Sequence, residues 1–172
     1  EYLSNKHLFD MTKRQMTGWL EQEYFPWNGF ELQYKGIEPK ILIEPLMRDK
    51  QDKICEEINV FCFKGKAKIV MKQFVHGENA LCFYDENLNC IEDIFGFDEM
   101  KIEEKADKLV FSAVELSEKL SHDFDFVRVD WLIFQNKIYF AELTFTPYSG
   151  FINFKNRENN KKLGALINID GK

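Results

Sequence analysis

The sequence lacks the signatures of several common protein classes. No apolar run approaches the roughly 20 residues that a membrane-spanning helix needs, and the first residues show no signal-peptide pattern. The net charge is -6 and the pI is near 5.2, which argues against a protein that binds nucleic acid through a basic surface. Internal repeats and low-complexity tracts are also missing. We expect no nucleic-acid partner and no membrane span, whereas nucleotide binding stays open because it needs only local donors.

Zinc-site and disulfide patterns are missing too. The sequence has four cysteines, Cys55, Cys62, Cys82 and Cys90, without any Cys-x-x-Cys pair, and its three histidines lie far from them. We predict that all four cysteines are reduced and structural, which favours the cytoplasm. Sequence order supports no Ser-His-Asp or Cys-His arrangement.

The composition supports a substantial core. The 172 residues are 45% hydrophobic and 15% aromatic, enough for one compact domain or for part of a larger one. Residues 10–24 are predicted to form a helix with Asp10 as N-cap and with its Met and Trp side chains in ordinary core packing. Residues 31–35 indicate a short strand, and residues 40–47 an apolar strand that ends around Glu44 and Pro45. Residues 48–56 read as a charged loop.

The middle of the chain predicts a hairpin, a strand and a helix. Strands 57–63 and 66–74 are separated by Lys64 and Gly65, which is typical of a tight turn. Alternating Lys64, Lys66 and Lys68 are typical of an exposed face or an edge strand. A short strand and turn follow over 80–90, and Asp98 is the predicted cap of a helix over 99–121. Its predicted buried stripe contains Met100, Ile102, Leu109, Val110, Ala113, Val114, Leu116 and Leu120.

A second hairpin, 126–134 and 137–145, is the most informative stretch. Arg128 and Asp130 share one face of the first strand, as Glu142 and Thr144 do on the second. Two carboxylates on one face repel each other unless they are protonated or bridged by a cation, and magnesium prefers oxygen ligands beside phosphates. The alternative is that Arg128 simply pairs with Asp130 or Glu142 at a solvated edge. The many apolar residues around these charges favour strands that are covered on both sides.

Strand register distinguishes the two interpretations. A strict two-residue turn at 135–136 places Asp130 opposite Ala141 and puts Glu142 on the other face. A three-residue turn, or a bulge, places Asp130 opposite Glu142 and Arg128 opposite Thr144. We predict the second arrangement.

These residues resemble a known family. Arg-Val-Asp at 128–130 and Ala-Glu-Leu-Thr at 141–144, followed by a Thr-Pro-Tyr-Ser-Gly loop, resemble the end of a TupA-like ATP-grasp domain. In ATP-grasp enzymes the pattern is Arg-x-Asp and then Glu-x-Asn, so Thr144 stands where Asn is usual. The resemblance implies the α+β fold of an ATP-grasp C-terminal lobe, an antiparallel sheet packed against helices, with the hinge strand and the end of the preceding lobe.

The resemblance also implies roles for particular residues. Asp130 and Glu142, with Thr144, would hold Mg, and Arg128 would contact the transferred phosphate or a substrate carboxylate. Glu44, Pro45 and Met47 would border the adenine of ATP. Glu57, or equally Glu56, would bind ribose hydroxyls. The family tends to read Asp-Tyr-Lys where this chain has Glu57, Ile58 and Asn59, so a lysine of the family is missing.

The implied organisation has two parts, residues 1–50 at the end of the central lobe with the adenine hinge, and residues 51–172 as the C-terminal lobe. A Gly-rich loop and two phosphate-binding lysines of the family have no match here, so we expect a fragment of a longer enzyme, the alternative being a degenerate relative. The implied activity is an ATP- and Mg-dependent carboxylate-amine ligase acting on a small carboxylate or a saccharide-linked acceptor, in bacterial surface polysaccharide biosynthesis. A non-catalytic nucleotide- or sugar-binding module, a glycosyltransferase-associated protein and a structural interaction domain are the alternatives. A homodimer stays open.

Overall fold

The computed structural model describes residues 6–22, 31–48, 55–74 and 80–167. The chain divides into two compact units, Glu1–Leu46 and Met47–Lys172. Among the helices of these described residues, none has the length and apolar character that crossing a membrane requires.

The first unit contains helix α1, Lys6–Leu20. The helix begins before Asp10, so the predicted N-cap is wrong, and the Asp10 carbonyl oxygen accepts a hydrogen bond from Arg14 inside the helix. The predicted end at Tyr24 lies outside the described residues. No residue of α1 is buried, and Met11 and Trp19 are half exposed. The predicted core packing of the α1 Met and Trp side chains is therefore wrong for these two residues.

Two strand predictions in the first unit are also wrong. A short 3-10 helix, η2, spans Leu32–Tyr34 where a strand was predicted. Residues 37–47 form neither helix nor strand, and the side chains of Leu42 and Ile43 are 81% and 79% exposed. Apolar residues alone do not make a strand, because the backbone N–H and C=O groups need a neighbouring strand. Pro45 has no N–H to contribute to such pairing.

The second unit is built on one sheet, which has seven strands among the described residues. Its strand order is β4-β3-β2-β1-β6-β7, with β5 also beside β3. All neighbouring strands are antiparallel except β3 and β5. The sheet and the helices confirm the predicted α+β class. The strands are β1 (Glu56–Phe63), β2 (Lys66–Phe74), β3 (Ala80–Tyr84), β4 (Cys90–Ile91), β5 (Met100–Lys101), β6 (Phe126–Phe134) and β7 (Lys137–Thr144).

Both predicted hairpins are confirmed, and each has a two-residue turn. Lys64 and Gly65 have φ of 49° and 74°, and Gln135 and Asn136 have φ of 49° and 58°. Positive φ at both turn positions gives a backbone twist that matches the strands on either side. Because β2 lies inside the sheet, its lysines do not protect an edge. Lys66 pairs with Glu118 instead.

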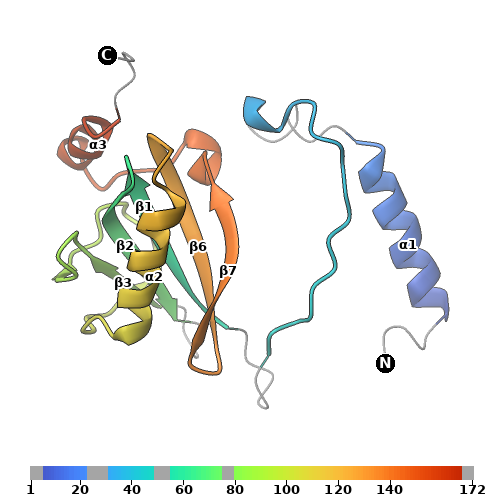
Figure 1. Cartoon of the computed structure of the whole chain (residues 1–172), viewed down its shortest axis with the longest axis horizontal. Helices are drawn as coiled ribbons and strands as arrows, with labels where there is room; N and C mark the ends of the chain where they lie inside the picture. The colour runs from blue at the N-terminus through green and yellow to red at the C-terminus, as the bar shows by residue number, and fades with distance from the viewer. Residues whose placement is uncertain (1–5, 23–30, 49–54, 75–79, 168–172) are drawn as a thin grey trace. The chain divides into compact units, whose positions relative to one another are not determined.

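Helix α2, Lys108–Leu120, covers one face of the sheet (Figure 1). The predicted cap at Asp98 is wrong, because Asp107 is the N-cap and accepts hydrogen bonds from the amides of Leu109 and Val110. Residues before it join the edge of the sheet instead: Met100–Lys101 form β5, and the Ile102 amide donates to the Leu81 carbonyl. Ser117 is buried on the sheet side of α2, whereas the predicted stripe members Leu116 and Leu120 are partly exposed.

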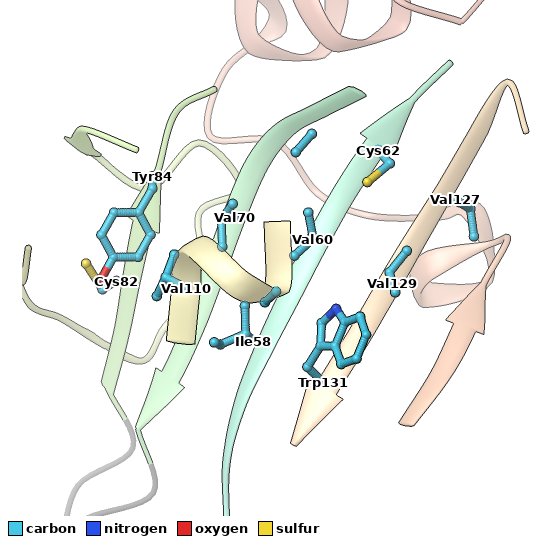
Figure 2. Close-up of a cluster of buried hydrophobic side chains, with 12 residues drawn as sticks. Ile58, Val60, Cys62, Val70, Cys82, Tyr84, Val110, Val127, Val129 and Trp131 are labelled. Carbon is cyan, nitrogen blue, oxygen red and sulfur yellow. The ribbon is translucent and has the colours of Figure 1, made fainter. Parts of the chain in front are cut away.

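A core cluster lies between α2 and the sheet (Figure 2). Alternate residues of the central strands point toward the helix, and Val110 and Ala113 of α2 meet them. Trp131 belongs to this cluster, and its indole N–H donates to Ser117 Oγ. All four cysteines are free; Cys62 and Cys82 are buried in this core, whereas Cys90 is exposed. The strand members of the cluster include Ile58, Val60, Cys62, Val70, Cys82, Tyr84, Val127 and Val129.

The opposite face of the sheet has a second, phenylalanine-rich cluster. Phe61, Phe63 and Phe83 extend from the strands, and Phe95 packs on Phe61 with ring centres 5.1 Å apart. Helix α3, Arg157–Gly164, contributes Leu163 to this layer and is capped by Asn156. This face also holds the polar residues of the second hairpin.

Candidate functional site

The predicted pairing in the second hairpin is formed through a bulge. Phe134 pairs with Lys137 across the two-residue turn, and the register then shifts between Asp130 and Trp131. Beyond the shift, Asp130 is opposite Glu142 and Arg128 is opposite Thr144. The bulge also places Leu143 opposite Val129, on the face covered by α2. A strict register would instead have buried Glu142 under α2.

Asp130 is a buried carboxylate with a full set of donors. Its Oδ1 accepts from Asn59 Nδ2 at 3.0 Å and from Arg128 Nε at 2.7 Å. Its Oδ2 accepts from the Arg128 terminal nitrogen at 2.8 Å and from the Thr144 hydroxyl at 2.8 Å. Arg128 therefore holds Asp130 in a bidentate ion pair, the geometry in which arginine and carboxylate interact most strongly. This ion pair was the alternative to a cation in the sequence analysis.

Glu142 is more open than Asp130. Strand β7 is an edge strand and is largely exposed, so the prediction that both strands are covered on both sides is wrong for β7. The Glu142 side chain is 66% exposed, and its Oε1 lies 4.0 Å from the Arg128 terminal nitrogen. The same oxygen lies 3.1 Å from Thr144 Oγ1. Because a hydroxyl has a single proton to donate, Asp130 and Glu142 compete for that of Thr144.

Negative charge exceeds positive charge on this face. Burial raises the pKa of the Glu57 carboxyl, and Asp130 and Glu142 raise it further, against the opposing effect of Arg128. The three carboxylates and the one guanidinium leave an excess of two negative charges when all are ionised. A divalent cation would neutralise that excess.

Tyr148 closes one side of the site. The centre of its ring lies 5.9 Å from the Arg128 guanidinium carbon, within the range of a cation–π contact. Tyr148 and Ser149 both have φ of 54°. A left-handed conformation is strained for these residues, and such strain is common beside binding sites. Burial raises the pKa of the Tyr148 phenol more than Arg128 lowers it.

Residues 2–168 match the model of the TupA-like ATP-grasp family. The chain belongs to this family. Membership in the TupA-like ATP-grasp family implies ATP binding and a ligase-like role. No curated protein and no solved structure matches the chain.

The site residues that the resemblance to the TupA-like ATP-grasp family implied fall into two groups. Glu57, Arg128, Asp130, Glu142 and Thr144 lie on one face of strands β1, β6 and β7. Glu44 and Pro45 belong to the first unit and are exposed, and Met47 is the first residue of the second unit. The expected hinge strand around them is absent from residues 40–47, all of which the structure describes.

Two residues that contact Asp130 or Arg128 were not predicted from the sequence. Asn59 appeared only as a departure from the family, yet it bonds directly to Asp130. Its position among apolar residues of a central strand was the available signal, because a buried amide needs a partner. No feature of the sequence indicated a role for Tyr148, because its contact with Arg128 depends on the conformation of the loop after β7. Lys66 of β2 pairs with Glu118 of α2 and Lys68 pairs with Glu86, so the printed ion pairs of both lysines are made away from Asp130.

The donor chemistry of the site fits magnesium. Magnesium is usually held by one or two carboxylates together with phosphate oxygens and waters, rather than by a complete protein cage. Asp130 and Glu142 supply two carboxylates whose oxygens both approach Thr144 Oγ1. Within the described part of the chain, no cluster of three or more His, Cys, Asp and Glu side chains has metal-binding geometry.

Proposed function

We propose that this TupA-like ATP-grasp chain provides the metal- and phosphate-binding face of an ATP-dependent carboxylate-amine ligase. The observation that supports the proposal is that Asp130 and Glu142 lie directly opposite each other, with the Thr144 hydroxyl within hydrogen-bond distance of both. In the proposal Asp130, Glu142 and Thr144 hold magnesium. When bound, magnesium would neutralise charge on the phosphate oxygens of ATP.

Arg128 is proposed to bind the transferred phosphate or the substrate carboxylate. Two of its nitrogens are bonded to Asp130, and its remaining terminal nitrogen makes no hydrogen bond to any residue that the structure describes. That N–H group is available to an oxyanion, while the ion pair keeps the guanidinium plane fixed. The Arg128 side chain is only 14% exposed, so an anion there would meet a partly desolvated charge.

We propose that other residues bind the adenine base and the ribose of ATP. Backbone groups of Pro45 and Met47, with the Glu44 side chain nearby, recognise adenine, and Glu57 binds ribose hydroxyls. In this organisation residues 1–50 end the central lobe and contain the hinge, and residues 51–172 form the C-terminal lobe.

The proposed reaction has two steps. An oxygen of the substrate carboxylate attacks the γ-phosphorus of ATP and the bond to ADP breaks, which forms an acyl phosphate. An amine then attacks the acyl carbon, and phosphate leaves as the amide forms. The acceptor is a small carboxylate or a saccharide-linked group, and the pathway is bacterial surface polysaccharide biosynthesis. Because the fold does not fix the substrate, the nucleotide step is the first to test.

Calorimetric titration of the chain with magnesium and ATP tests the proposal. The double variant Asp130→Asn, Glu142→Gln removes both carboxylate charges, whereas Asp123→Asn, Glu158→Gln makes the same chemical changes at exposed positions. We expect magnesium-dependent binding by the wild-type chain and by the control, and its loss in the first variant. Equal binding by all three folded proteins, or none by the wild type, would contradict the proposed site.

One observation favours a non-catalytic nucleotide-binding module as the second candidate. Asp130 already accepts four hydrogen bonds from Asn59, Arg128 and Thr144, so it is stable without a cation. Fusing the chain to a lobe that carries a Gly-rich phosphate-binding loop distinguishes the ligase from the non-catalytic module. ADP release that depends on a carboxylate and an amine supports the ligase, and ATP binding without ADP release supports the module.

A further inference from the structure

The second unit contains an apolar pocket beside Arg128. The pocket has a volume of about 280 Å³ and includes six phenylalanines, and apart from Thr146 and Asn160 its lining residues have no polar side chain. An engineered apolar cavity of about 150 Å³ binds benzene. The pocket in this chain is therefore large enough for a substituted aromatic ring. The phenylalanines are Phe61, Phe63, Phe95, Phe126, Phe145 and Phe154.

The rings are arranged as aromatic pairs around this space. Phe63 and Phe126 have ring centres 4.9 Å apart and planes tilted by 53°, and Phe95 and Phe154 have centres 5.6 Å apart and planes tilted by 44°. Tilted pairs of this kind present both ring edges and ring faces to a third aromatic group. A charged group has no partner in such a lining, so the part of a ligand that enters must be uncharged.

The pocket and the proposed ligase site share structural elements. Phe61 lines the pocket, and the Arg128 guanidinium carbon lies 6.0 Å from the centre of its ring. Strand β7 brings Glu142 and Thr144 to the site and continues directly into Phe145 and Pro147 of the pocket wall. A ligand could therefore place its anionic end at Arg128 and its apolar end in the pocket by extending past one contact, that of the Phe61 ring with the Arg128 guanidinium.

We infer that the pocket binds the aromatic group of the carboxylate substrate, with the carboxylate of that substrate at Arg128. The inference rests on the proposed function, because it places the substrate next to Asp130 and Glu142. It adds the substrate class: a carboxylic acid with an aromatic ring a few bonds from the carboxyl group. Aromatic side chains are favoured over linear chains because six phenylalanine rings line the pocket.

Three probes separate the two ends of this ligand. 3-Phenylpropionate has both the ring and the carboxylate, propionate has only the carboxylate, and 3-phenylpropanamide has the ring and a neutral amide. We expect 3-phenylpropionate to bind the wild-type chain at least about tenfold more tightly than either partial probe. Methyl NMR signals of Ile152 and Leu163 should shift on binding, and that of Leu116 on α2 should not.

A bulky side chain introduced at the wall of the pocket tests the location. Gly164 ends α3 and lines the pocket, and a side chain added there meets no atom within 4 Å. Gly164→Phe should abolish the preference for 3-phenylpropionate over propionate. Gly18→Phe is the matched control, because Gly18 lies in helix α1 and also has open space around it. Equal urea midpoints for the wild type and both variants establish that folding is unchanged.

The outcomes distinguish the pocket from the proposed ligase. Binding of 3-phenylpropionate that Gly164→Phe abolishes supports the pocket, even if magnesium and ATP do not bind and the ligase proposal fails. Magnesium–ATP binding together with no preference for 3-phenylpropionate overturns the pocket inference alone. Equal affinity for 3-phenylpropionate and 3-phenylpropanamide would overturn the position of the carboxylate at Arg128.

Discussion

Asn59 on β1 lies directly opposite Asp130 on β6, and its side-chain amide donates to Asp130 Oδ1 over 3.0 Å. Both residues are 5% exposed. The family tends to have lysine where this chain has Asn59. The neutral Asn59 amide donates a hydrogen bond to the Asp130 carboxylate but does not neutralise its negative charge. That charge still interacts with Arg128, Thr144 and any bound cation.

Replacement of Asn59 by leucine should therefore destabilise the protein. Leucine fills a similar volume but gives Asp130 Oδ1 no hydrogen bond, and the loss of a bond to a charged group costs about 1.5–3 kcal/mol. Urea unfolding should show this loss in the free energy of unfolding. Asn153→Leu, at an exposed position, is the control. If both variants lose the same small amount, Arg128 and Thr144 are sufficient to hold Asp130.

Glu57→Gln should stabilise the chain at neutral pH. The folded-state pKa of Glu57 is raised, first by burial and then by Asp130 and Glu142. Folded protein therefore binds the proton more tightly than unfolded protein, and stability falls as pH rises from about 4.3, the ordinary pKa of glutamate, through the raised folded-state pKa. The variant lacks this contribution, so it should be no more stable than the wild type near pH 4 and more stable at pH 7.

Urea unfolding of both proteins from pH 4 to pH 8 measures the effect of Glu57. Glu158→Gln, on the exposed face of α3, provides the comparison and should show no such trend. Magnesium should reduce the advantage of Glu57→Gln if the cation binds at Asp130 and Glu142. A stability difference that is constant across the pH range would mean that the Glu57 pKa is not raised.

Thr144 provides a test of the metal ligands. Thr144→Val removes the hydroxyl that approaches both carboxylates and should weaken magnesium binding roughly tenfold, as loss of a ligand or of its supporting partner commonly does. Thr144→Asn introduces the residue that is usual in ATP-grasp enzymes and should bind magnesium at least as tightly as the wild type. Magnesium titration in the presence of ATP measures both. An unchanged affinity in Thr144→Val would exclude Thr144 from the cation site.

Ser117 supports the core beneath the site. Its hydroxyl accepts the indole N–H of Trp131 at 2.8 Å, and Ser117 is 0% and Trp131 5% exposed. Ser117→Ala should cost about 1–3 kcal/mol, because the buried N–H is left without an acceptor. Ser112→Ala is the control, since the exposed Ser112 hydroxyl bonds only to a carbonyl of its own helix. Urea unfolding reports the difference, and equal stability of the two variants would mean that water replaces Ser117.

Local patterns determined the two hairpins and the face on which the acids meet. Two-residue turns at Lys64–Gly65 and Gln135–Asn136 follow from the spacing of the β-rich runs, and alternation then assigns each side chain to a face. Even the bulge has a cause in the sequence, because Leu143 gains by burial beside Val129 and Glu142 gains by leaving that face. The resemblance to the TupA-like ATP-grasp family was visible in the same residues.

Other features were decided only by tertiary structure. Asp98 and Asp107 are both good caps, and α2 begins at the second because residues 100–102 are bonded to β3. The apolar run at 40–47 has strand propensity, but no strand among the described residues pairs with it, so it does not become one. The hydrogen bond from the Asn59 amide to Asp130 joins β6 to a strand distant in sequence, and the phenylalanine pocket forms only where several separate segments meet. Such contacts depend on long-range packing, which a pattern of neighbouring residues does not encode.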